Sequence, residues 1–279
     1  VTVVDAHQFW TTFDSKESLM DGDTEKDLGN LLIEQIEFCD VLLLNKCDLV
    51  DEETLDEIEE MIEVLQPRAE IICTEHGVVD PGAIVDTGRF DFEEASQSAG
   101  WMQELQEPHE SAEKEHGVTS FVFESRRPFH PERFAELLDE FPRNVVRSKG
   151  HFWLAGREEM ALGLNVAGQS IRITPAGAWI ATLPDEEREP YFEANPQLKE
   201  AWDDQWGDRG TQLVFIGTDM DHDALRADLD AATLTEEEMD ADWNAFEDRF
   251  PAFEFEDEAA ESDDTEAGEN SAEEVGLAD

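Results

Sequence analysis

Basic residues are scarce in this chain: its 279 residues include 71 Asp and Glu but only 19 Lys and Arg, giving a net charge of −52 at pH 7. That balance argues against direct binding to nucleic acids or to anionic membrane surfaces, because both repel a polyanion. Residues 236–279 hold 19 of the acids and a single base, so the other 235 residues still carry 52 acids against 18 bases. The acidity is therefore a property of the whole chain.

A body with this charge repels itself at ordinary ionic strength, and a cytoplasm rich in counterions is the usual physical remedy. Six lysines among so many acids resemble the composition of a halophilic archaeal protein. The alternative is an acidic protein from an ordinary organism, which would bear that repulsion unscreened.

Cysteine is rare as well: Cys39, Cys47 and Cys73 are widely spaced, and each lies in or beside an apolar run. That pattern is typical of small buried side chains in a reducing compartment, and no C-x-x-C pair is present. The sequence has no apolar run long enough to cross a membrane and no recognisable signal peptide. We therefore expect a cytoplasmic protein without a membrane partner.

A phosphate-binding loop is not found in the sequence, although a nucleotide site needs a glycine-rich turn followed by Lys and Ser or Thr. The nearest match runs from Gly163 to Ser170, but it has Gln169 where the lysine belongs and lies between two apolar runs. We interpret it as a β-hairpin. The D-x-x-G at residues 204–207 is interpreted as a chance match between helices.

The most informative segment that is present is VLLLNKCDLV at residues 41–50, a hydrophobic strand that runs into Asn45-Lys46-x-Asp48. Guanine presents two adjacent donors, its N1–H and its amino group, and the two oxygens of the Asp48 carboxylate match both. Adenine would leave that carboxylate unpaired, which discriminates strongly against it. Asn45 can bond the base edge or tie neighbouring loops together, and the methylene stem of Lys46 can lie against the base and sugar. The alternative interpretation is a turn that matches by chance.

Strand and helix patterns alternate around this motif. Strands are expected at residues 1–5, 41–44 and 69–73, and helices at about 24–38 and 52–65. The first helix has apolar residues at helical spacing, namely Leu28, Leu31, Leu32 and Ile36. The β-α-β-α-β order requires a parallel sheet with right-handed crossovers. Because the first strand starts at once, we expect the chain to begin within a domain.

Ligands of such sheets bind at the carboxyl ends of the strands, where two further groups are expected beside the motif. Asp5 ends the first strand, and it either lies near the nucleotide or caps the following loop. Thr74 and Glu75 follow the third strand and are expected to form a second loop whose backbone contacts the guanine oxygen.

Several segments, taken in order, resemble the CobW-type GTPases, a family of P-loop GTPases that act as metal chaperones and insertases. The first half shows VTVVDA, the strand with the guanine motif, and a Gln66-Pro67-x-Ala69 step into the third strand. The second half resembles three signatures of the family's C-terminal domain, at residues 121–131, 146–155 and 207–217. The resemblance covers residues 1–232. The family's phosphate loop, switch segments and Cys-x-Cys-Cys metal motif would all precede Val1.

The resemblance implies an α/β fold in which a partial P-loop GTPase parallel sheet is followed by a smaller α+β CobW C-terminal domain. The expected boundaries are 1–90 for the GTPase part, 91–117 for an acidic linker, 118–234 for the C-terminal domain and 235–279 for an acidic tail. Two apolar islands of the tail, 243–246 and 250–255, could dock as a short helix and an arm. Residues after Glu256 are expected to be disordered.

The resemblance also implies a guanine-nucleotide-binding metal chaperone, in which GTP binding and hydrolysis with Mg²⁺ drive delivery of zinc or cobalt to a metalloprotein client. Nucleotide contacts would come from Asn45, Lys46, Asp48, Thr74 and Glu75, with no catalytic or metal-binding residue in the chain itself. We expect the chain alone not to hydrolyse GTP, because the parts that position and neutralise the phosphates are missing. The alternative is a non-catalytic interaction module that needs a separately supplied front half.

Two further groups have simpler interpretations beside functional ones. His109 and His116 lie in the linker, where a weak metal contact is the functional interpretation and a solvated segment the one we favour. Five bases fall within 24 residues. They could form a patch that binds the nucleotide domain, an acidic partner or a nucleotide phosphate. We favour the alternative, in which they make internal ion pairs with surrounding carboxylates. The five bases are Arg126, Arg127, Arg143, Arg147 and Lys149.

Stability of the fold should rise with salt, because surface carboxylates repel one another over about 10 Å at 0.1 M salt but over only about 3 Å at 1 M. Unfolding spreads the same charges apart. A thermal melt followed by circular dichroism in potassium chloride from about 0.1 to 3 M should therefore show a rising midpoint. Salts that strengthen apolar burial should add a further increment. A midpoint that stays flat or falls with salt would refute the expectation.

Overall fold

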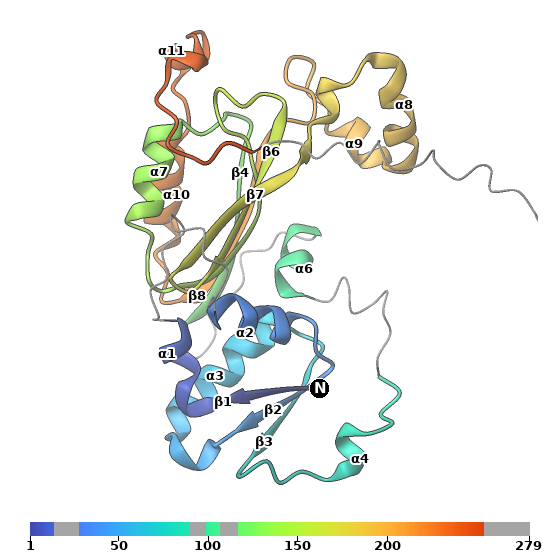
Figure 1. The fold of residues 1–279 in the computed structure, drawn as a ribbon, viewed down its shortest axis with the longest axis vertical. Coiled ribbons are helices and arrows are strands. Elements are labelled where there is room, and N and C mark those ends of the chain that lie inside the picture. Colours follow the sequence, from blue (N-terminus) through green and yellow to red (C-terminus); the bar gives the residue numbers. More distant parts are fainter. Residues whose placement is uncertain (14–27, 90–98, 107–116, 254–279) are drawn as a thin grey trace, which may run out of the picture.

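The structure is a computed structural model that describes residues 1–13, 28–89, 99–106 and 117–253. Within these ranges the first part of the chain forms a three-stranded parallel sheet with strand order β1-β2-β3 (Figure 1). The strands are β1 (Thr2–Asp5), β2 (Val41–Asn45) and β3 (Glu70–Thr74). The crossover helices are α2 (Leu28–Glu37) and α3 (Glu52–Leu65). The predicted parallel β-α-β-α-β order is confirmed.

The buried face of α2 agrees with the predicted apolar positions at Ile36 and in part at Leu32, which packs against the core, but not at Leu28 and Leu31. Leu28 and Leu31 are more than half exposed, whereas Ile33 and Ile36 are fully buried. The helix turns this face toward both the sheet and a hairpin of the second domain, and Gly29 packs so closely that a Cβ would lie 3.1 Å from the Ala167 carbonyl oxygen. The predicted positions 24–27 lie outside the described residues.

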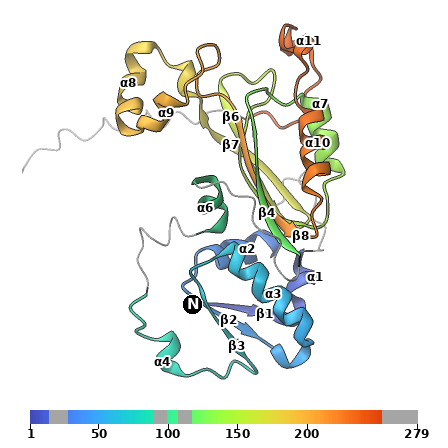
Figure 2. The same cartoon turned by 180° about the vertical axis from the view of Figure 1, so that it is seen from behind.

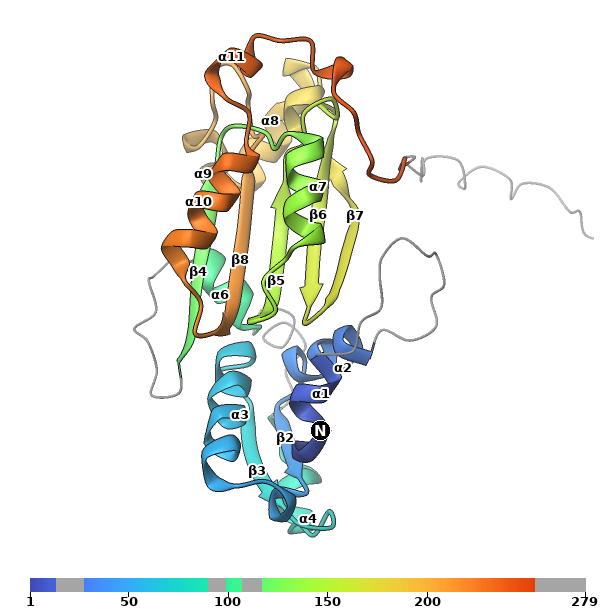
Figure 3. The ribbon, with the colours of Figure 1, turned by 90° about the vertical axis from the view of Figure 1, so that its left-hand side faces the viewer.

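A five-stranded antiparallel sheet forms the second part of the chain, with strand order β4-β8-β5-β6-β7 in the described residues. Its strands are β4 (Val118–Ser125), β5 (Val145–Phe152), β6 (Met160–Ala167), β7 (Ser170–Ala178) and β8 (Thr211–Thr218). The helices α7 (Pro131–Asp139) and α10 (His222–Ala232) cover one face of this sheet (Figure 3). The predicted hairpin is confirmed, because Ala167 pairs with Ser170 across Gly168-Gln169.

Strand β5 carries a β-bulge. Val145 pairs with Gly217 of β8, but the next pair joins Arg147 to Ile216, so Val146 is the extra residue. Val146 and Ile216 both belong to the apolar cluster that the first domain shares with this sheet.

A projection between β7 and β8 contains η3 (Ile180–Thr182), α8 (Asp185–Ala194) and α9 (Pro196–Glu200) (Figure 2). The Asp208 carboxylate accepts hydrogen bonds from the backbone N–H groups of Ile180 and Ala181, at 2.8 and 2.9 Å. Arg126 donates to the carbonyl oxygens of Ala201 and Arg209. The 207–209 motif therefore fastens the projection to the sheet.

A buried ion pair joins the two domains. The Arg147 guanidinium has no exposed surface and donates to both oxygens of the Glu37 carboxylate, at 2.6 and 2.9 Å. It also donates to Asn165 and to the Val166 carbonyl oxygen. The side-chain amide of Gln66, from the predicted step into β3, donates to the backbone oxygen of Glu37. Elements far apart in sequence thus converge on the last residue of α2.

Helix α6 (Gly100–Gln106) braces the same junction, beside the five-stranded sheet and above α2 and α3 (Figures 1 and 2). The Lys149 ammonium lies 4.4 Å from the centre of the Trp101 ring, a cation–π contact. Gly100 approaches α3 so closely that a Cβ would lie 1.8 Å from the Val64 carbonyl oxygen, so no larger residue fits there. The helix is therefore packed against both domains.

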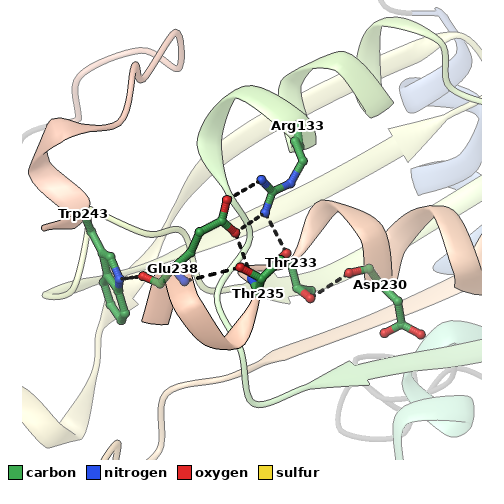
Figure 4. Close-up of polar contacts among 6 residues, drawn as sticks. All are labelled: Arg133, Asp230, Thr233, Thr235, Glu238 and Trp243. Atoms are coloured by element: carbon green, nitrogen blue, oxygen red, sulfur yellow. Dashed lines mark hydrogen bonds and ion pairs between the residues drawn. The ribbon is translucent and has the colours of Figure 1, made fainter. Parts of the chain in front are cut away.

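Residues 235–253 pack on the second domain. Thr235 and Glu238 form a capping box at α11 (Glu236–Met239), and the Glu238 carboxylate binds the Arg133 guanidinium at 2.7 and 2.8 Å (Figure 4). Arg157 donates to Asp248 and to the carbonyl oxygens of Phe250 and Pro251. The apolar islands at 243–246 and 250–253 supply ring contacts with Trp153, His130 and Phe134. The predictions for residues 91–98, 107–116 and 254–279 fall outside the described residues.

Replacing Glu37 with Gln should destabilise the protein by about 3–5 kcal/mol, because it leaves the Arg147 charge buried and poorly paired. Glu34→Gln, one turn earlier on the exposed side of α2, is the matched control and should change the unfolding free energy by less than about 0.5 kcal/mol. Urea unfolding followed by circular dichroism would measure both. Equal stabilities of the two variants would contradict the role of this ion pair.

Glu238 should contribute stability that depends on pH. The hydrogen bonds from Arg133 lower the pKa of Glu238 to about 2 from an ordinary 4.5, even though burial alone would raise it. A lowered carboxyl pKa adds stability that is fully present above about pH 4.5 and is lost as the pH falls toward 2. The side chain is about one quarter exposed, so we expect Glu238→Gln to cost about 1–2 kcal/mol at neutral pH.

Urea unfolding at about pH 7 and about pH 3 would test this, because the first condition lies above the window in which the stabilisation is lost and the second lies within it. The difference between wild type and Glu238→Gln should shrink at the lower pH. Glu237→Gln in the same helical turn is the control and should show no such change. A pH-independent difference for Glu238→Gln would count against the assigned pairing.

Candidate functional site

The carboxyl ends of the three parallel strands meet in one row. Asp5 of β1 pairs in register with Asn45 of β2, and Asn45 pairs with Thr74 of β3. The three polar residues that end these strands are therefore neighbours, as expected from their positions, although only β2 is buried along its apolar length. The row lies at the edge where α/β sheets bind their ligands.

Asn45 ties this row to the loop after β3. Its side-chain oxygen accepts hydrogen bonds from the Gly77 N–H at 2.9 Å and from the Thr74 hydroxyl at 3.2 Å. The backbone reverses at His76 and Gly77, both with positive φ. Of the two roles considered for Asn45, its oxygen performs the loop-tying one. Thr74 is buried and Glu75 is exposed, so the loop places Glu75 beside the motif and facing solvent.

Lys46 has a left-handed backbone, with φ 66° and ψ 32°. Its ammonium lies 2.6 Å from Oδ2 of Asp5, and the Lys46 side chain remains 44% exposed. The other oxygen of Asp5 accepts from the His7 N–H at 3.0 Å and caps η1 (Ala6–Gln8). Burial alone would raise the pKa of Asp5, but the hydrogen bond and charge of Lys46, together with hydrogen bonds from the backbone N–H groups of Gln8 and His7, outweigh it and the pKa is lowered.

Asp48 lies in the short turn η2 (Cys47–Leu49), which the Leu49 N–H closes by donating to the Lys46 carbonyl oxygen. Its carboxylate is exposed and has no hydrogen bond or ion pair within the described parts of the chain. A carboxylate with both oxygens available is what guanine recognition requires. The donor and acceptor pattern of the site therefore fits a guanine base, while no phosphate-binding loop accompanies it in the sequence.

The sequence analysis missed the Asp5–Lys46 pair, although the signal was available. Asp5 and Asn45 both end strands of a predicted parallel pair, so the residue after Asn45 had to lie within reach of Asp5. Gly77 was also missed, because a single glycine in a polar loop carries no sign of which side chain its N–H will meet.

The predictions for cysteine were partly wrong. Cys39 is buried as expected, and Cys47 is half-buried, but Cys73 is exposed. The thiol of Cys73 donates to the Glu59 carboxylate at 2.8 Å, and partial desolvation together with that negative charge raises the pKa of Cys73. Among the residues that the structure describes, no group of three or more His, Cys, Asp or Glu side chains could hold a metal ion.

The five clustered bases do not form one patch. Arg147 makes the expected internal ion pair, whereas Lys149 contacts the Trp101 ring and Arg126 contacts backbone carbonyls. The prediction of internal ion pairs thus overlooked backbone carbonyl oxygens as partners of Arg126 and an indole ring as the partner of Lys149.

Over the described ranges, no helix is long and apolar enough to cross a bilayer.

Two protein families match this chain. Residues 1–73 match the family described as "CobW/HypB/UreG, nucleotide-binding domain", and residues 118–233 match "Cobalamin synthesis protein cobW C-terminal domain". Together the two matches cover well over half of the sequence, and they flank the region around α6.

Curated relatives extend across both matches. Zinc-regulated GTPase metalloprotein activator 1 of Dictyostelium discoideum is 37% identical over 249 residues, which cover 86% of this chain and 52% of that protein. Zinc chaperone Rv0106 of Mycobacterium tuberculosis is 30% identical over 258 residues, which cover 90% of this chain and 60% of that protein. The Zn(II)-bound YjiA GTPase from E. coli matches at 19% identity with a TM-score of 0.36, over 84% of this chain and 61% of that one. The chain thus spans little more than half the length of these relatives.

Proposed function

This chain belongs to the CobW family of P-loop GTPases, and from that premise we propose that it is the base-reading and C-terminal part of a GTP-dependent metal chaperone. The observation that carries the proposal is the exposed Asp48 carboxylate, which has no partner among the described residues and lies beside strand ends that hydrogen bonds tie together. In the complete protein, GTP binding and hydrolysis would bias a conformational switch that loads or releases a divalent metal.

The proposed base site divides the work among its residues. Asp48 accepts from the N1–H and amino group of guanine, and the Lys46 stem lies against the base. Because the Gly77 N–H and the Thr74 hydroxyl occupy the Asn45 oxygen, Asn45 acts by holding the second loop in place. The backbone at Thr74 and Glu75 then contacts the guanine oxygen. Adenine in this place would leave the Asp48 carboxylate without the two donors that guanine supplies, which makes the wrong base costly to accept.

The proposed cargo is a divalent metal, zinc or cobalt, delivered to a metalloprotein client. Zinc is favoured, because two of the relatives are named as a zinc-regulated activator and a zinc chaperone. In this proposal the chain itself contributes no ligand to the cargo. The ligands for the cargo and for Mg²⁺, and the groups that hold the phosphates, would come from the rest of the complete protein.

A second candidate is a non-catalytic interaction module that combines half a GTPase with a docking domain and works only with a separately supplied front half. It is favoured by the lack of a Lys-containing phosphate loop in the 279 residues. The coding DNA upstream of the Val1 codon separates the two proposals. An in-frame glycine-rich loop with Lys and Ser or Thr supports the chaperone, and a stop codon followed by a genuine start supports the module.

Exchanging Asp48 for Asn in the complete protein should weaken GTP binding by about 2–4 kcal/mol, because one acceptor oxygen becomes a donor that faces a donor of guanine. Xanthosine triphosphate, which has a carbonyl at that position, should bind better than to wild type. Isothermal titration with both nucleotides would measure the change.

Asp51→Asn is the matched control for this exchange, since Asp51 caps α3 by accepting from the Thr54 N–H and Asn caps a helix equally well. Its nucleotide preference should equal that of wild type. An Asp48→Asn variant with unchanged GTP affinity would show that Asp48 does not read the base.

A further inference from the structure

We propose that Asp5 is a positioning residue of the base site, which fixes Lys46 so that its methylene stem is already in place before a nucleotide arrives. The inference rests on the proposed guanine site and adds to it a residue outside the Asn-Lys-x-Asp motif. It assigns separate tasks to the two carboxylate oxygens of one side chain.

The two oxygens of Asp5 are both used, and in different ways. Oδ1 accepts from the His7 N–H at 3.0 Å, which closes the turn after β1. Oδ2 accepts from the Lys46 ammonium at 2.6 Å, a short charge-assisted contact. The capping task needs only an oxygen, so asparagine would serve as well. The negative charge is needed only for Lys46, which is why the aspartate points to a task beyond the cap.

The geometry of Lys46 explains what the contact achieves. Its left-handed backbone is unfavourable for a residue with a Cβ, and it turns the chain at the end of β2. From there the side chain reaches across to the end of β1, so its stem spans the carboxyl ends of both strands. The side chain remains partly exposed, so its methylenes are accessible to a ligand. A base placed against them would bury apolar surface without moving the lysine.

Preorganisation turns this geometry into affinity. A free lysine has many rotamers, and ordering it when a ligand binds reduces the affinity for that ligand. In this fold the ordering takes place when the protein folds, because Asp5 is held by its own strand and turn. The Lys46 ammonium already has the Asp5 carboxylate as its hydrogen-bond partner, so ligand binding does not have to remove water from an unpaired charge.

The test uses guanosine as the probe, because the uncharged nucleoside avoids repulsion by the acidic chain and needs no phosphate-binding loop. Affinities of the whole 279-residue chain would be measured by NMR titration, with adenosine for comparison, at a salt concentration where wild type is folded. Asp5→Asn should bind guanosine about two- to tenfold more weakly than wild type, the loss expected when one long side chain must be ordered on binding. Asp221→Asn, a matched change at the cap of α10, should leave the affinity unchanged.

A double-mutant cycle separates positioning from capping. Lys46→Met keeps an apolar stem but has no charge to anchor, so adding Asp5→Asn to it should cause no further loss. An equal loss in both backgrounds, or no loss for Asp5→Asn alone, would overturn the inference. If wild type binds guanosine no better than adenosine, the proposed base site itself is wrong. Those two failures are therefore distinguishable.

A measurement on wild type alone covers the case in which a variant does not fold. Relaxation of the Lys46 Cε, read by NMR without ligand, should show a more ordered methylene than that of Lys199. Lys199 makes an exposed contact of 3.4 Å with Glu189 and lies 5.6 Å from the centre of the Phe192 ring, both weaker than the 2.6 Å contact of Lys46, so it is the internal reference. A Lys46 stem as mobile as that of Lys199 would also overturn the inference.

Discussion

The buried ion pair between Arg147 and Glu37 is the contact on which the arrangement of the two domains depends. Removing two charges from water is costly, and that cost is offset only if the geometry is good and the remaining donors are satisfied. Here the guanidinium meets both oxygens of Glu37, and Asn165 and the Val166 carbonyl take its other donors. Apolar contacts between domains tolerate small rotations, whereas a buried fork of hydrogen bonds accepts one geometry. Since α2 leads directly into β2, that geometry also fixes the strand that carries the base motif.

Other segments that resemble family signatures also lie at joints of the fold. Gln66 binds the backbone of Glu37, Lys149 covers Trp101, and Asp208 fastens the projection between β7 and β8. Gly150 has a φ of 146°, and a Cβ there would lie 2.1 Å from the Gln212 carbonyl oxygen, so two backbones meet where no side chain fits. In the second domain, therefore, these motifs contain residues that join parts of the fold, whereas in the first domain the Asn45-Lys46-x-Asp48 motif forms the candidate base site.

Sequence reasoning located what depends on local pattern and missed what depends on distant partners. The continuous apolar run before Asn45 predicted a buried parallel strand, and the position of residues 163–170 between two apolar runs predicted a hairpin, because both signals lie within a few residues. The partner of Arg147 is 110 residues away in a chain with 71 acids, so nothing distinguished Glu37 from its neighbours. Leu28 and Leu31 share helical spacing with Ile36, yet only Ile36 of these three is buried, because the packing against the sheet and the second domain centres on Ile33 and Ile36. In residues 235–253 the acidic composition suggested a tail, while a few aromatic rings and Arg157 hold the segment in place.

The bulge in β5 decides which way Arg147 faces. Without Val146 as the extra residue, the strand would pair Arg147 with Phe215, whose ring lies in the phenylalanine-rich core beneath α7 and α10. The bulge places the arginine on the opposite face of the sheet, where it pairs with Glu37. One inserted residue thus changes the face of the sheet on which the following side chains of the strand lie. If the same residues paired without the bulge, the Arg147 charge would turn toward the phenylalanine-rich core and the Glu37 carboxylate would lose its partner, so the register of this strand, and not only its side chains, decides whether the two domains are joined.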